Sequence, residues 1–207
     1  ETYHAFCNQI TLPVVKPTAS YLRFITWQKN TISNELLTKQ RDFWQKQLIQ
    51  LPKLELIYDK TKKEGNEKPI SDRIPFSISA KTTHRLKNIA IANQSTLYDV
   101  LISAFGLFLS HYSNQRDINF ITAVSGRHHA HVAQTIGFFV NLLLIRIHIH
   151  DHDNFSDLIK KNKKLLHDVF ENQDLPFNEM IQLTGERVNS KIHSFNQAGF
   201  IFQNYPI

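Results

Sequence analysis

A long apolar run, Ile136–Arg146, constrains the fold of this chain more than any other segment. It has a glycine at its second position, passes through two phenylalanines and a valine, and continues as Leu142-Leu143-Leu144-Ile145. Continuous apolar runs are typical of strands that are buried on both faces. Asn141 interrupts the run, and a buried amide without hydrogen-bond partners costs roughly 1–3 kcal/mol. We therefore predict a buried strand in which Asn141 either holds neighbouring backbone or faces a channel for substrate amides.

Helical periodicity dominates residues 1 to about 52, where apolar side chains between Leu36 and Leu48 recur at spacings of one, four and seven. Ser33 or Asn34 is the candidate N-cap, and Pro52 ends the pattern. The charged stretch 60–69 contains a glycine and is predicted to be an exposed loop or linker.

Strand and helix patterns alternate from residue 70 onward. Strands separated by long helices indicate an α/β chain with α+β layering, in which helices flank a mixed sheet. The predicted strands are Arg73–Ser79, Ile118–Val124, Phe138–Ile149 and Ala198–Tyr205. The predicted helices run from Ser79 to Asn93, from Ser95 or Thr96 onward, from Asn154 or Ser156 onward, and from the turn Asp174–Phe177.

The chain has 207 residues, a net charge of +6 and one cysteine, Cys7. A basic surface favours an anionic partner, but no nucleic-acid-binding motif is recognisable, so we expect no nucleic-acid binding. One cysteine excludes an internal disulfide framework and a cysteine-rich zinc site. We find no membrane-spanning run and no signal peptide, and we expect a cytoplasmic protein that does not bind membranes. Because Met180 is the one methionine and the sequence begins with Glu1, we expect a piece of a longer protein.

Two histidine clusters are candidate metal sites. One spans residues 128–131, and the other is His148, His150 and His152, which alternation would place on one face of an extended strand. The first cluster follows the Gly126-Arg127 turn and the second sits at a predicted strand end, so both are expected to be exposed. Histidine clusters bind metal only when their geometry converges, so we predict no metal site.

Two charged residues stand at the boundaries of predicted elements. Arg127, after Gly126, stands at the end of a strand, where a guanidinium can hold a carboxylate or simply lie at the surface. Asp174 precedes Pro176 and is predicted to cap the helix that follows.

Three segments resemble sequence motifs of the condensation domains of nonribosomal peptide synthetases, which belong to the chloramphenicol acetyltransferase-like superfamily. They are Tyr21–Trp27, Ile136–Arg146 and Asn172–Phe177, in the order that the family has, and Phe202-Gln203-Asn204 is similar to its last strand. The positions that carry the resemblance are Tyr21, Trp27, Gly137, Phe139, Gln173, Asp174, Pro176, Phe177, Gln203 and Asn204, with Gly126, Arg127 and Asn141 as residues that support the active site.

The resemblance implies a lobe of a two-lobed fold whose active site lies in a tunnel between the lobes. The family's catalytic His-His-x-x-x-Asp-Gly motif ends the N-terminal lobe, and His128-His129 does not match it because no Asp-Gly follows. Residues 69–207 are therefore expected to be the C-terminal lobe and residues 1–68 the connecting helical segment, with no catalytic residue in this sequence. Arg127 is expected to pair with the aspartate of the absent motif, and Asn141 to lie near the tunnel. Leu142 replaces a usual threonine, and residues 191–195 depart from the family pattern.

The implied function is peptide-bond formation between aminoacyl or peptidyl thioesters on carrier domains. The implied partners are those carrier domains, an adenylation domain and the N-terminal lobe, and the carriers would deliver phosphopantetheine without any cofactor bound to this lobe. By itself the lobe is expected to be inactive. Two alternatives stay open: another coenzyme A- or carrier-dependent acyltransferase of the superfamily, and a non-catalytic docking lobe from a degenerate or epimerising domain.

Overall fold

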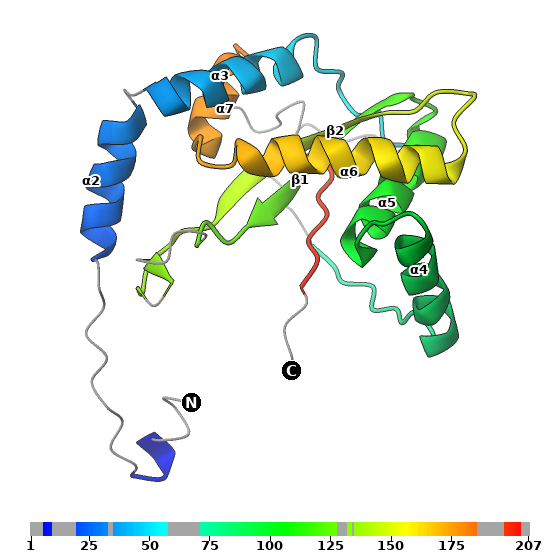
Figure 1. The fold of residues 1–207 in the computed structure, drawn as a ribbon, viewed down its shortest axis with the longest axis horizontal. Coiled ribbons are helices and arrows are strands. Elements are labelled where there is room, and N and C mark those ends of the chain that lie inside the picture. The colour runs from blue at the N-terminus through cyan, green and yellow to red at the C-terminus, as the bar shows by residue number, and fades with distance from the viewer. Residues whose placement is uncertain are drawn as a thin grey trace.

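The computed structural model describes residues 6–9, 20–32, 35–57, 71–127, 132–133, 135–185 and 197–203. Its helices and strands follow one another as α2 (Tyr21–Ile32), α3 (Glu35–Leu48), α4 (Ala80–Ala92), α5 (Leu97–Ser113), β1 (Asp117–Val124), β2 (Asn141–His148), α6 (Phe155–Glu171) and α7 (Phe177–Leu183). In Figure 1, α6 lies across the two strands, α3 and α7 lie side by side, and α2 lies at the edge of the body. No helix within these ranges is long and apolar enough to span a bilayer.

The sheet has both parallel and antiparallel pairing. β1 and β2 are antiparallel, with Asp117 opposite His148 and Val124 opposite Asn141. On the other side of β1, a parallel bridge joins Ile121 to Gly199. Ile121 N donates to Ala198 O at 3.0 Å, and Phe200 N donates to Ile121 O at 2.9 Å. These pairings agree with the predicted α/β class and its mixed sheet flanked by helices.

Both faces of the sheet are covered. On one face, the Phe120 ring meets the Phe105 ring of α5 edge to face, with 5.1 Å between centroids. On the other face, Asn119 and its cross-strand neighbour Arg146 reach the chain just after α3. The strands are buried on both sides, as the continuous apolar run predicts. The largest fully buried side chains are Trp44, Phe120, Leu37, Leu54, Ile102, Ile118, Leu143, Ile145, Ile147, Ile159, Leu166 and Leu175.

Local capping signals place the starts of α4, α5 and α6 correctly. Ser79 accepts from Thr82 N at the start of α4, as predicted. Thr96, rather than Ser95, caps α5, and Asn154, rather than Ser156, caps α6. Both of these N-caps belong to a capping box whose third helical residue is an aspartate. The predicted caps Ser33 and Asn34 of α3 lie outside the described residues.

Three strand predictions were wrong in extent or kind. The segment Arg73–Ser79 is not a strand, because it has no strand partner in the described part of the chain, and Ile74 and Phe76 are exposed. The C-terminal segment forms a single bridge in place of a strand from Ala198 to Tyr205, whose last two residues are not described. β2 begins at Asn141 rather than Phe138, because its partner β1 ends at Val124.

The predicted division of the chain at residue 68 stays a prediction. Leu37, Trp44 and Leu48 of α3 lie in the same buried cluster as Leu143 of β2 and Leu166 of α6. The helix that precedes residue 68 therefore contributes to the core around the sheet.

Arg146 joins β2 to the end of α3. Its Nε and Nη2 donate to the carboxylate of Asp117 at 3.0 and 2.6 Å. Its Nη1 donates to the carbonyls of Gln47 and Ile49, and Nη2 also donates to that of Gln50, where the backbone turns through a positive φ of 49°. All five guanidinium hydrogens thus have acceptors, and carbonyls that the end of α3 leaves open are satisfied.

We expect Arg146→Lys to lower the free energy of unfolding by about 1–3 kcal/mol, because an ammonium cannot reach this set of acceptors. Chemical denaturation measures the change. Arg116→Lys is the matched control, since Arg116 forms an exposed ion pair with Asp151 and should change stability by less than about 0.5 kcal/mol. Equal effects of the two substitutions would contradict this role of Arg146.

Candidate functional site

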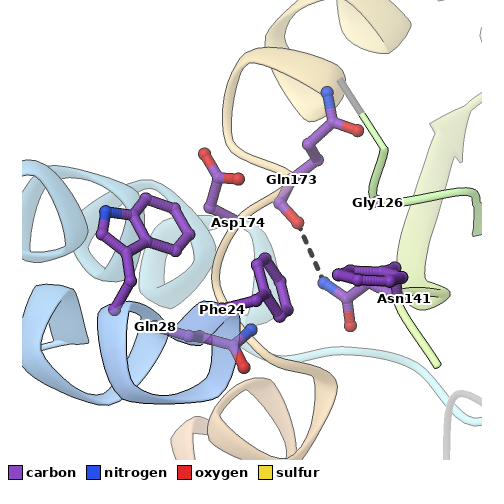
Figure 2. Close-up of a pocket in the computed structure, with 8 residues that line it drawn as sticks. Phe24, Gln28, Gly126, Asn141, Gln173 and Asp174 are labelled. Carbon is purple, nitrogen blue, oxygen red and sulfur yellow. Dashed lines mark hydrogen bonds between the residues drawn. The ribbon is translucent and has the colours of Figure 1, made fainter. Parts of the chain in front are cut away.

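A pocket lies where α2, the ends of both strands and the turn between α6 and α7 meet (Figure 2). One part of its wall is aromatic, and the rest carries amides and a carboxylate. The lining residues are Phe24, Trp27, Gln28, Gly126, Phe139, Asn141, Gln173 and Asp174.

Aromatic contacts hold α2 against the pocket. The Phe139 ring is 4% exposed and lies edge to face with the rings of Tyr21 and Phe24, at centroid distances of 5.2 and 4.7 Å. The Tyr21 hydroxyl donates to Phe138 O at 2.9 Å. A Cβ on Gly137 would lie 2.5 Å from Cδ2 of Tyr21, so the close approach of α2 needs a glycine there.

Gly126 permits the turn that follows β1. Its φ is +63°, and a Cβ would lie 1.9 Å from Phe139 O, so both the backbone angle and the space exclude other residues. The turn brings the end of β1 beside the segment that leads into β2.

Arg127 organises the loop that leads into β2. Its Nη1 donates to the carbonyls of Val132 and Thr135 at 2.8 and 2.7 Å, and Nη2 donates to Gly137 O at 3.2 Å. The guanidinium also stacks over the Phe139 ring, with Cζ 4.4 Å from its centroid. Arg127 is therefore not a simple surface arginine, and its pairing with an aspartate beyond this sequence stays a prediction.

Asn141 connects the start of β2 to the turn between α6 and α7. Its Nδ2 donates to the carbonyls of Gln173 and Leu175, both at 2.9 Å, and its Oδ1 accepts from Phe177 N at 3.1 Å. The first of these bonds is dashed in Figure 2. Asn141 thus holds backbone, the first of the two predicted roles, and it also lines the pocket.

Asp174 is not the N-cap of α7, contrary to the prediction. The N-cap is Pro176, which offers no side-chain acceptor, and the amide of Phe177 is bonded to Asn141 instead. Pro176 ends the turn, and an amide from a distant strand replaces the local cap. The sequence around the helix could not reveal this partner, because Asn141 and Phe177 are 36 positions apart.

Two residues of α3 hold the same turn and were not predicted as site residues. Gln40 is 3% exposed, and its Oε1 accepts from the amides of Asp174 and Leu175 at 3.0 and 2.9 Å. Trp44, fully buried, donates through Nε1 to Asn172 O at 2.7 Å. Their only sequence signal was an inward position on a helix, since Gln40 is four residues before Trp44.

Other predicted positions either lie elsewhere or fall outside the described residues. Gln203 is exposed, and Asn204 and the histidines of residues 128–131 lie outside the described residues. His148 approaches Asp117, and His150 stacks on His152. Within the described ranges, no three His, Cys, Asp or Glu side chains are close enough together to hold a metal ion.

Comparison with known proteins gives consistent matches. A family model described as the condensation domain matches residues 1–207. Bacitracin synthase 3 of Bacillus licheniformis is 29% identical over 196 residues, which are 94% of this chain and 3% of that protein. Surfactin synthase subunit 1 of Bacillus subtilis (strain 168) is 33% identical over 188 residues, 90% of this chain and 5% of that protein.

A solved structure has the same fold. The first condensation domain of the calcium-dependent antibiotic synthetase, in complex with a substrate analogue, has a TM-score of 0.76 and 15% identity to this chain. The match covers 99% of this chain and 45% of that one. The chain thus spans a small part of its curated relatives and under half of the solved structure.

We expect Asn141→Leu to lower the free energy of unfolding by roughly 2–4 kcal/mol, because Phe177 N and the carbonyls of Gln173 and Leu175 lose their partner. Denaturant titration measures the change. Gln173→Ala is the control in the same turn, because its carbonyl remains and only the side-chain bond to Phe170 O is lost. It should cost less than about 1 kcal/mol, and an equal cost would contradict the proposed importance of the amide of Asn141.

Proposed function

The chain belongs to the condensation-domain family of nonribosomal peptide synthetases, and from that premise we propose that it is the C-terminal part of a domain that forms peptide bonds. In this proposal residues 69–207 are the C-terminal lobe and residues 1–68 connect it to an N-terminal lobe. The donor and acceptor are aminoacyl or peptidyl groups, each bound as a thioester to the phosphopantetheine of a carrier domain. An adenylation domain of the same synthetase would load a carrier.

The reaction is an aminolysis. The acceptor amine nitrogen attacks the donor thioester carbonyl, a carbon–nitrogen bond forms, and the carbon–sulfur bond breaks. The amine loses a proton, and the pantetheine sulfur leaves as a thiol once protonated. No residue of this chain is given a role in proton transfer. We assign the proton transfer to the family's histidine motif, which this sequence does not contain. Holding two tethered reactants together can itself lower the barrier by several kcal/mol.

The observation that carries the proposal is the convergence of the motifs on one pocket. Phe24 and Trp27 of the first motif, Phe139 and Asn141 of the second, and Gln173 and Asp174 of the third all line it. The three segments are far apart along the chain, yet Asn141 bonds the second motif to the third, and Tyr21 bonds the first to the second. This supports a role for the lobe as a wall of the substrate channel.

A transfer assay on the full-length synthetase tests the function. The carriers are loaded with a donor acyl thioester and an acceptor aminoacyl thioester, and the acceptor carrier is analysed by mass spectrometry. We expect its mass to increase by the acyl group through an amide bond. Acyl transfer from coenzyme A to a free hydroxyl or amine would instead indicate another acyltransferase, and no transfer with correctly loaded carriers would indicate a docking lobe.

We expect Arg127→Ala to reduce amide formation in the full-length protein by about tenfold or more, since the carbonyls of Val132, Thr135 and Gly137 lose their donor and the pocket wall at Phe139 shifts. Initial rates of acyl transfer measure the effect. Arg85→Ala is the control, because Arg85 is exposed on α4. Full turnover and an unchanged melting temperature for Arg127→Ala would remove Arg127 from the site.

A further inference from the structure

Gln40 contacts both the backbone and a side chain of the turn of residues 172–177. Asn141 and Trp44, which hold the same turn, bond to its backbone atoms. Gln40 accepts from two backbone amides, and its Nε2 also donates to Oδ2 of Asp174 at 3.1 Å. Gln40 is thus the partner from α3 that fixes both the backbone and the side chain of a residue lining the pocket.

The requirement for an amide at position 40 follows from these contacts. The carbonyl oxygen of Gln40 must be an acceptor for the amides of Asp174 and Leu175, and the nitrogen must be a donor for a carboxylate. A hydrocarbon side chain supplies neither, and a carboxylate supplies only the acceptor. Gln40 is 3% exposed and Leu175 fully buried, so water has little access to replace a lost partner.

We propose that Gln40 is a positioning residue for the condensation reaction. It sets the place of Asp174 and Gln173 in the pocket wall through the two amides and the carboxylate that it binds. The inference rests on the proposed function, because the wall matters for turnover only if substrates pass it. Gln40 itself acts through the turn and touches no reacting atom.

The decisive variant is Gln40→Glu. It keeps an acceptor for both backbone amides, so the chain should still fold, but it puts a second carboxylate about 3 Å from that of Asp174. Two carboxylates so close cannot both ionise without repulsion, and the pKa of one of them rises. Arg41, the next residue of α3, is already paired with Glu179 of α7 at 2.8 Å.

The variant should therefore become dependent on pH. Near neutral pH we expect kcat/KM for amide formation to fall between about 10- and 100-fold relative to the unsubstituted protein. As pH falls, one carboxyl keeps a proton and can donate to the other, so the ratio of variant to unsubstituted activity should rise. Gln45→Glu, on the exposed side of the same helix, adds the same charge and should leave the rate unchanged.

A second substitution should restore the pair. In Gln40→Glu with Asp174→Asn, the carboxylate at 40 still accepts the backbone amides and now also accepts from the amide at 174. The hydrogen bond is reversed but complete, so the pH dependence that Gln40→Glu adds to kcat/KM should disappear, whatever the loss of the Asp174 carboxylate itself does to the rate. Wild-type turnover in Gln40→Glu at every pH, or an added pH dependence that persists in the double variant, would overturn the inference.

Hydrogen exchange separates this inference from the proposed function. Mass spectrometry on the peptide that contains residues 172–177 should show faster exchange in Gln40→Glu near neutral pH and recovery in the double variant. If that pattern appears but the unsubstituted protein forms no amide, the proposed function fails while the positioning of the turn stands. Unchanged exchange in Gln40→Glu would contradict the positioning itself.

Discussion

The candidate site depends on the backbone of residues 172–177, and side chains from elsewhere in the chain hold that backbone. Gln40 and Trp44 approach from α3, and Asn141 approaches from β2. A turn that ends in a proline has little internal hydrogen bonding of its own, so its amides and carbonyls need external partners. These three side chains bind the amides of Asp174, Leu175 and Phe177 and the carbonyls of Asn172, Gln173 and Leu175. The same contacts fix Gln173 and Asp174 in the pocket wall.

Two arginines also bind backbone groups of irregular segments, through several hydrogen bonds from one planar guanidinium each. Arg146 donates hydrogen bonds to carbonyls at the end of α3, and Arg127 donates to carbonyls of the loop before β2. Each guanidinium has several donors in a fixed plane, so a single side chain can order a segment without regular secondary structure. α3 is thereby fixed to the sheet, and the loop is fixed against the aromatic contacts of α2.

Predictions from the sequence succeeded where the signal is local and failed where a partner is needed. Ser79, Thr96 and Asn154 cap helices because the acceptor and the amide it binds are three residues apart. The segment Arg73–Ser79 alternates like a strand, but no strand lies beside it in the described ranges. Aspartate is a residue type that favours N-caps, but it is Asn141 rather than Asp174 that accepts from the amide of Phe177 at the start of α7. Gln40 had no signal beyond helical spacing, because its three bonds span more than 130 positions.

The sequence by itself determined the α/β class, the buried strand around Leu143, the starts of α4, α5 and α6, and the family motifs. It did so because apolar periodicity, capping and glycine positions are written into neighbouring residues. Only the tertiary structure decided that Asn141 bonds the second motif to the third, that Arg127 binds carbonyls of its own loop, and that α3 holds the pocket wall. Those contacts depend on which distant segments the packed sheet and helices bring within hydrogen-bond distance, about 3 Å, and spacing along the chain does not encode that.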